Sequence, residues 1–272
     1  MTRLGIGTYA FAWSIGVAGY PPPPRPMDAL ALLHKAAGLG VKVVQFADNL
    51  PLDRLSDPEQ TALLAEARRL GLELEVGTRG IAPGHLRHSL EIALRFGSPI
   101  LRTILDTKEH KPSPEEAVAL LHSVLPEFER AGVTIAIENH DRFRSATLAE
   151  IVRRCESPRV GICLDTVNSF GALEGPEAVV GNLGPLTVNL HFKDFRIRRA
   201  EHNMGFLVEG TPAGQGMLNT PWLLERLGSY GRSFATILEQ WPAPEPDPQA
   251  TAEKESAWAG ESIAYLRTLI EE

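Results

Sequence analysis

The sequence is poor in cysteine, in basic residues and in long apolar runs. Its two cysteines, Cys155 and Cys163, exclude a disulfide scaffold and a zinc finger. Lys and Arg number 27 against 34 Asp and Glu, for a net charge of −7, whereas nucleic-acid binding depends on basic groups that neutralise phosphates. Residues 1–11 lack the features of a signal peptide, and no stretch approaches the roughly 20 apolar residues of a membrane span. We therefore expect a soluble, cytoplasmic protein that binds neither nucleic acid nor membrane.

Strand-like and helix-like segments alternate along the chain. Short apolar or β-branched runs predict strands, and amphipathic segments that open at Ser or Pro and close at Gly predict helices. The predicted strands cover residues 4–11, 41–47, 72–78, 100–105, 134–138, 160–165, 187–195 and 233–239. The predicted helices cover residues 27–39, 58–70, 83–96, 114–131, 147–155, 176–183, 221–227 and 251–270.

These eight strand–helix units predict one α/β domain over residues 1–272. Alternating strands and helices imply parallel pairing, and eight units in a chain of this length are typical of a closed (β/α)8 TIM barrel. A doubly wound open sheet is the competing architecture, but Gly5–Tyr9 lacks the third glycine of its phosphate loop and the helix that follows. One long loop, residues 196–219, lies between the seventh strand and the seventh helix.

Polar residues stand near the ends of the last four predicted strands. The inward positions, opposite in parity to the large aliphatic residues, are held by Glu138, Asp165, His191 and Glu239. Active sites of such barrels form at this end of the strands. Three confined carboxylates cannot stay ionised and unpaired, so one interpretation is a divalent ion held by them and the imidazole, with Mn²⁺, Mg²⁺ or Co²⁺ suiting these ligands. The other interpretation is four unrelated salt bridges at the barrel rim.

The segments around these positions resemble a known family. The xylose isomerase-like barrels, which include sugar isomerases and epimerases, inosose dehydratases and hydroxypyruvate isomerases, have segments similar to Ile137–His140, Cys163–Thr166, Leu190–Asp194, Gly214–Leu218 and Leu238–Glu239. The resemblance spans the chain. It implies that the four inward residues ligate a metal ion and that Glu138 and Glu239 are also the acid/base pair. Two positions depart from the ketose 3-epimerases: Asn168 replaces a substrate-contacting His, and Arg196 follows His191 by five residues instead of six.

The resemblance implies a metal-dependent isomerase or epimerase acting on a small ketose or sugar derivative. Removal of a proton next to a carbonyl creates an enediolate, which a divalent ion stabilises, and Glu138 and Glu239 would take and return the proton. Relatives assigned to decarboxylation of branched 3-oxo sugar acids, such as 3-oxo-isoapionate, have a similar long loop. Because loss of CO₂ also leaves an enediolate, a metal-dependent decarboxylase is the alternative, with arginines of the 196–219 loop binding the carboxylate.

Further polar residues are candidates for contact with this small-molecule sugar or sugar acid. They are Gln45, Arg102, His140, Asn168, Lys193, Arg196 and His202. Ion pairing is the alternative for Arg102, and a solvated basic loop is the alternative for Arg196 and His202. Gln45 and His140 are also candidates for supporting the ligands.

Two other classes share this barrel. Endonucleases that act at abasic sites with three zinc ions need more His ligands and a basic face, which this acidic chain lacks. A non-catalytic sugar-binding barrel would be favoured by a missing ligand position, yet all four are present. The sequence leaves open whether the protein is a homo-oligomer.

Overall fold

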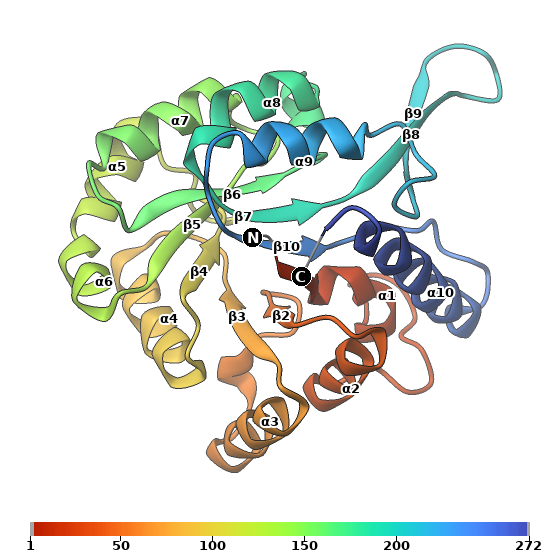
Figure 1. The fold of residues 1–272 in the computed structure, drawn as a ribbon, viewed down its shortest axis with the longest axis horizontal. Coiled ribbons are helices and arrows are strands. Elements are labelled where there is room, and N and C mark those ends of the chain that lie inside the picture. Colours follow the sequence, from red (N-terminus) through yellow and green to blue (C-terminus); the bar gives the residue numbers. More distant parts are fainter. Residues whose placement is uncertain (1–2, 271–272) are drawn as a thin grey trace.

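The computed structural model describes residues 3–270 and contains a closed barrel of parallel strands (Figure 1). The barrel strands are β1 (Arg3–Gly7), β2 (Val43–Phe46), β3 (Glu73–Gly77), β4 (Ile100–Thr103), β5 (Thr134–Glu138), β6 (Val160–Asp165), β7 (Thr187–Phe192) and β10 (Ala235–Leu238). Around the barrel the order is β1-β10-β7-β6-β5-β4-β3-β2. The predicted (β/α)8 TIM barrel is confirmed, because each strand pairs in parallel with a neighbour in chain order and β10 closes on β1.

Helices surround the barrel on its outside (Figure 1). They are α1 (Ala12–Ile15), α2 (Ala29–Leu39), α3 (Asp57–Leu70), α4 (Pro83–Phe96), α5 (Pro114–His122), α6 (Leu125–Ala131), α7 (Ser145–Arg154), α8 (Pro176–Leu183), α9 (Thr220–Gly228) and α10 (Pro248–Arg267). The short 3-10 helices are η1 (Thr8–Phe11), η2 (Leu52–Arg54), η3 (Asn168–Ala172) and η4 (Gly184–Leu186). None of the helices within residues 3–270 is long and apolar enough to cross a membrane.

Local signals explain where several helices begin and end. A capping box between Ser56 and Glu59 opens α3, and Gly71 closes it at a φ of 67°, a left-handed conformation that glycine adopts at little cost. The predicted helix 114–131 is interrupted between α5 and α6. Pro126 accounts for this break, because it lacks an N–H and its ring would clash with the carbonyl of His122 in a continuous helix.

Below the polar C-terminal strand ends, the barrel interior contains apolar clusters as well as the buried polar residues Glu75 and Asn189. Two small clusters contain only strand residues: Val43, Ala235 and Ile237 in one, and Ile100, Ala136 and Cys163 in the other. Several polar residues of the site lie two positions further along the same strand parity, as Glu138 does after Ala136 and Asp165 after Cys163. The large core between strands and helices uses the opposite parity, with residues such as Ile137 and Leu164.

The segment predicted as the loop 196–219 is instead largely an antiparallel hairpin. Its strands are β8 (Asp194–Arg199) and β9 (Phe206–Thr211), and it projects away from the barrel beside α9 (Figure 1). Charged and apolar residues alternate along 194–198 of β8, which suits a ribbon with one apolar face.

Asp194 holds the base of this hairpin. Its buried carboxylate accepts hydrogen bonds from the backbone N–H groups of Gly214 at 2.8 Å, Gly216 at 3.1 Å and Leu218 at 3.1 Å. A Cβ atom on Gly216 would lie 2.1 Å from Asp194 Oδ1. The Gly-x-Gly turn is therefore explained by the close approach of its backbone to this carboxylate.

Candidate active site

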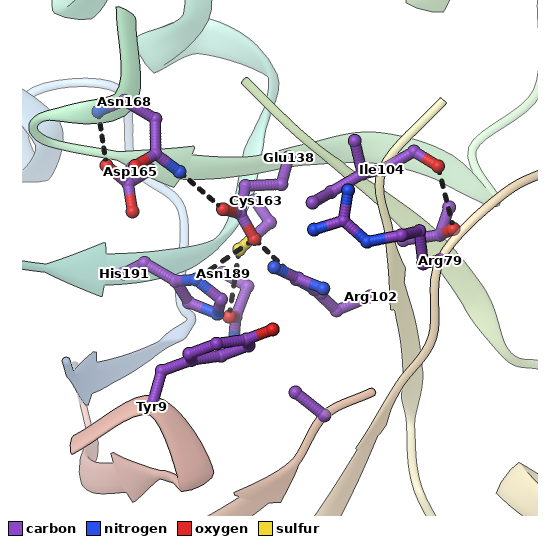
Figure 2. A network of polar contacts seen from close by, with 12 residues as sticks. Tyr9, Arg79, Arg102, Ile104, Glu138, Cys163, Asp165, Asn168, Asn189 and His191 are labelled. Atoms are coloured by element: carbon purple, nitrogen blue, oxygen red, sulfur yellow. Dashed lines mark hydrogen bonds and ion pairs between the residues drawn. The ribbon is translucent and has the colours of Figure 1, made fainter. Parts of the chain in front are cut away.

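The predicted ligand residues lie together at the C-terminal end of the barrel interior, and Figure 2 shows Glu138, Asp165 and His191 among them. His191 is at the centre: its Nδ1 is 3.1 Å from Glu138 Oε2 and 3.2 Å from Glu239 Oε1. Asp165, His191 and Glu239 each offer a ligand atom within 4.8 Å of the other two, and Glu138, Cys163 and His191 form an overlapping group of the same kind. All of these side chains are buried.

The chemistry of this group fits a divalent cation. Within residues 3–270, His191 Nδ1 and Glu239 Oε1 are buried atoms that face each other without an aligned hydrogen bond. On the other side of the ring, His191 Nε2 lies 2.6 Å from Gln45 Oε1 and donates to it. A neutral ring therefore directs the lone pair of Nδ1 at two carboxylates, and a cation between them removes this repulsion. One imidazole with three carboxylates is a donor set suited to Mn²⁺, Mg²⁺ or Co²⁺.

A proton on His191 is the competing cation. Burial alone would lower the pKa of His191, but the charges of Glu239 and Glu138 outweigh burial and raise that pKa. Metal binding at Nδ1 would therefore displace a proton from the ring.

Glu138 has both of its carboxylate oxygens occupied. Oε2 forms an ion pair with the guanidinium of Arg102, and Oε1 accepts a hydrogen bond of 2.7 Å from Asn168 Nδ2 (Figure 2). Burial would raise the pKa of Glu138, but the charges of Arg102 and His191 hold it well below its usual range. Arg102 is itself 2% exposed and also reaches Asp48 at 3.4 Å. Arg102 thus forms the ion pairs that were the alternative to substrate contact.

Lys193 joins the other two carboxylates. Its Nζ lies 2.7 Å from Asp165 Oδ2 and 2.9 Å from Glu239 Oε2. Burial would lower the pKa of Lys193, but these two carboxylates outweigh burial and raise it. The ammonium group therefore keeps its charge, and it lines the cavity described next.

A cavity of about 550 Å³ lies next to the site, a size that accommodates a small ligand. Its polar lining comes from Asn168, Lys193 and Gln240. Its other walls are mostly apolar and aromatic: Tyr9, Ala12, Trp13, Val17, Val167, Phe170, Val208 and Trp241. The Tyr9 hydroxyl donates to Asp48 at 3.3 Å, and burial, followed by the charge of Asp48, raises the pKa of Tyr9 to about 12.

The structure divides the predicted substrate-contacting residues into four groups. Asn168 and Lys193 line the cavity, whereas Gln45 and Arg102 are buried against the ligands. His140 is half-exposed, pairs with Asp141, and shares a separate small depression with Glu138.

Arg196 and His202 form the fourth group, on the exposed hairpin. In the part of the chain that the structure describes, neither is among the residues that line the cavity. The neighbouring arginines contact other residues of the hairpin: Arg198 pairs with Glu209 at 2.7 Å, and Arg199 stacks on the ring of Phe206. The extended ribbon directs these side chains along its own surface, which explains why the loop cations do not reach the ligands.

Two buried polar residues of the site were not predicted from the sequence. Glu75 on β3 and Asn189 on β7 form hydrogen bonds with each other and with Gln45 beneath the ligands. Their inward strand parity was the available signal. The aromatic residues Tyr9, Trp13 and Trp241, which follow strand ends in the sequence, also form part of the cavity wall.

Comparison with known proteins places this geometry in a family. Residues 33–269 match the family model described as xylose isomerase-like TIM barrel. The chain is 35% identical over 265 residues to the 3-oxo-isoapionate decarboxylase of Pectobacterium atrosepticum, covering 97% of this chain and 95% of the relative.

Solved structures of other proteins have the same fold as this chain. The chain is similar to D-psicose 3-epimerase with D-tagatose from Clostridium cellulolyticum H10, with a TM-score of 0.75, 16% identity and full coverage of both chains. It is also similar to the IolI protein with a bound zinc atom, with a TM-score of 0.72, 18% identity and full coverage of both chains. The chain therefore belongs to the xylose isomerase-like TIM barrel family.

Proposed function

We propose that this protein is a divalent-metal-dependent decarboxylase of a 3-oxo sugar acid. The observation that carries the proposal is the difference between the two glutamates. Both oxygens of Glu138 are engaged by Arg102 and Asn168, whereas Glu239 Oε1 has no aligned hydrogen-bond donor among the described residues. A reaction that needs a free carboxylate on each face of the sugar is poorly served by this arrangement. Decarboxylation begins without removal of a proton, so it needs no such pair.

The decarboxylase relative supports the same reaction. It matches nearly the whole chain at 35% identity, whereas the epimerase structures match at 12% to 17% identity. A metal ion held by Glu138, Asp165, His191 and Glu239 would supply Lewis-acid stabilisation of negative charge on the substrate oxygens.

Lys193 would bind the substrate carboxylate, because its ammonium group keeps its charge at the polar end of the cavity. The bond between the carboxyl carbon and its neighbour breaks, CO₂ leaves, and the electron pair passes into the adjacent 3-oxo group. The carbon that lost CO₂ then takes up a proton.

Tyr9 Oη would hold this proton, since its raised pKa keeps the phenol neutral in the cavity wall. The apolar walls exclude water, which strengthens the electrostatic interactions of Lys193 with an anionic substrate.

An isomerase or epimerase of a neutral ketose is the second candidate. It is favoured by the position of the hairpin arginines, since a carboxylate held by Arg196 or its neighbours would require them near the cavity. Glu239 would then act as the base, with Asn168 binding a sugar hydroxyl.

A substrate comparison separates the two reactions. We expect the Mn²⁺-loaded protein to release ¹³CO₂ from a carboxyl-labelled 3-oxo sugar acid such as 3-oxo-isoapionate. Neutral ketoses incubated in D₂O should show neither interconversion nor deuterium uptake. Deuterium uptake into a ketose without release of CO₂ from the acid would instead establish the isomerase.

A further inference from the structure

A buried polar network lies directly beneath the candidate metal site. Glu75 is 3% exposed, and its Oε2 accepts hydrogen bonds from Gln45 Nε2 at 2.9 Å and from Asn189 Nδ2 at 3.0 Å. Gln45 and Asn189 are fully buried. Burial raises the pKa of Glu75 while the two amides oppose that rise, so holding a carboxyl group here costs free energy.

The acceptor at Glu75 determines which way both amides point. Oε2 accepts hydrogen bonds whether the carboxyl is ionised or carries its proton on Oε1, so both amides must direct their NH₂ groups at it. The amide oxygens then point away from Glu75. Asn189 Oδ1 accepts from Gln45 Nε2 at 3.1 Å, which reinforces this orientation of Gln45.

The orientation of Gln45 in turn determines which ring nitrogen of His191 carries hydrogen. Gln45 Oε1 faces His191 Nε2 at 2.6 Å and can only accept. Nε2 must therefore donate, and the neutral ring presents the lone pair of Nδ1 to Glu138 and Glu239.

We propose that Glu75 is a positioning residue that selects, through Gln45, the His191 tautomer whose Nδ1 ligates the divalent ion. It does not touch the substrate or the ligand atoms. Without an acceptor at position 75, the Gln45 amide can rotate and present its NH₂ group to Nε2, which would place the ring hydrogen on Nδ1. This proposal rests on the metal site within the proposed function but not on the reaction.

The test compares variants at two positions of β3. Glu75→Met removes the acceptor, whereas Glu75→Gln retains an amide oxygen that can accept both hydrogen bonds. Glu73→Gln is the matched control, since Glu73 lies two residues away on the exposed end of β3 and pairs with Arg3. Mn²⁺ affinity is measured by electron paramagnetic resonance, with circular dichroism to verify folding. We expect Glu75→Met to weaken binding roughly 10- to 100-fold, Glu75→Gln to restore most of the affinity, and Glu73→Gln to bind as the wild type does.

A second measurement needs no variant at position 75. In Mg²⁺-loaded wild type labelled with ¹⁵N-histidine, the His191 signals, assigned by their loss in His191→Gln, should show a protonated Nε2 and an unprotonated Nδ1. Hydrogen on Nδ1, or a folded Glu75→Met protein that binds Mn²⁺ within about twofold of wild type, would overturn the proposal. So would a wild type that binds no divalent ion. If affinity falls as expected but no CO₂ is released from sugar acids, the reaction assignment fails and the role of Glu75 stands.

Discussion

At the scale of single residues, Glu239 is a proposed ligand of the metal ion, and it would also be the base in the second candidate reaction. One of its oxygens faces His191 without an aligned hydrogen bond in the described chain, and the other pairs with Lys193. Glu239→Gln preserves the size of the side chain but removes the negative charge of a proposed metal ligand and its basic oxygen. We expect the fold to persist and the rate to fall roughly 10²- to 10⁴-fold. The measurement is turnover at saturating Mn²⁺, with the exposed Glu225→Gln as control. Turnover near that of wild type would show that Glu239 is not essential.

Lys193 is the group proposed to bind the substrate carboxylate, so it should determine whether an acid is preferred over a neutral sugar. Loss of a hydrogen bond to a charged group removes about 1.5–3 kcal/mol, so Lys193→Met should lower kcat/KM for a 3-oxo sugar acid roughly 10- to 100-fold. Exposed Lys111→Met is the control. Kinetics at two salt concentrations test the charge directly, because binding of the acid should weaken with salt in wild type and not in Lys193→Met. Unchanged kinetics for the acid would remove Lys193 from the substrate site.

At the scale of elements, α10 supports the cavity wall that α1 contributes. Glu255 on α10 accepts hydrogen bonds from the N–H groups of Trp13 at 3.0 Å and Ser14 at 2.8 Å, and from the Ser14 hydroxyl at 2.7 Å. Gln240 Nε2 donates to the carbonyl groups of both Ala10 and Glu255. Trp13 lines the cavity, so these hydrogen bonds connect a distant helix to the proposed substrate site.

The same glutamate makes stability depend on pH. Burial raises the pKa of Glu255 from 4.5 to about 7, although its three hydrogen bonds oppose the shift. The folded state therefore binds a proton more tightly than the unfolded state, and this stabilisation is complete below pH 4.5 and lost as the pH rises through 7. The contribution is on the order of 3 kcal/mol.

Denaturant unfolding at pH 5 and at pH 8 measures this contribution. Relative to Glu255→Gln, wild type should lose stability between the two pH values, whereas the exposed control Glu253→Gln should follow wild type. Parallel pH profiles for wild type and Glu255→Gln would contradict the assignment.

The hairpin β8–β9 carries charged side chains that are exposed and lie outside the cavity lining. Arg196 is exposed on it and, among the described residues, is not part of the cavity lining. Replacements at such positions usually change free energies by no more than about 0.5 kcal/mol. Arg196→Ala should therefore keep kcat/KM for the acid within about twofold of wild type. A tenfold loss would show that the hairpin folds over the cavity when substrate binds.

At the scale of the whole molecule, metal binding should stabilise the barrel, because the ligands come from four strands that separate on unfolding. At an ion concentration 100 times Kd, the gain is about 2.7 kcal/mol, and removal of the ion should lower Tm by roughly 5 °C in a chain of this size. Thermal unfolding after chelation and after Mn²⁺ addition measures this. His191→Gln is the control, and its Tm should not respond to Mn²⁺. A wild-type Tm that is equally insensitive would argue against a metal site.

The sequence alone determined the architecture and the position of the four inward residues. Strand parity, helix caps and glycine-terminated helices are local signals, since they depend on residues only a few positions apart. They therefore predicted the barrel, and they placed Glu138, Asp165, His191 and Glu239 at one end of it.

The tertiary structure decided which polar groups satisfy one another and which remain for a ligand. Gln45 and His191 are 146 residues apart, and Trp13 and Glu255 are 242 residues apart, so local patterns carry no information about these pairs. The sequence left both substrate contact and ion pairing open for Arg102, and closure of the barrel paired it with Glu138. Closure of the barrel also created the buried acceptor at Glu75 and the aromatic cavity wall, because both require strands and loops from opposite ends of the chain to meet.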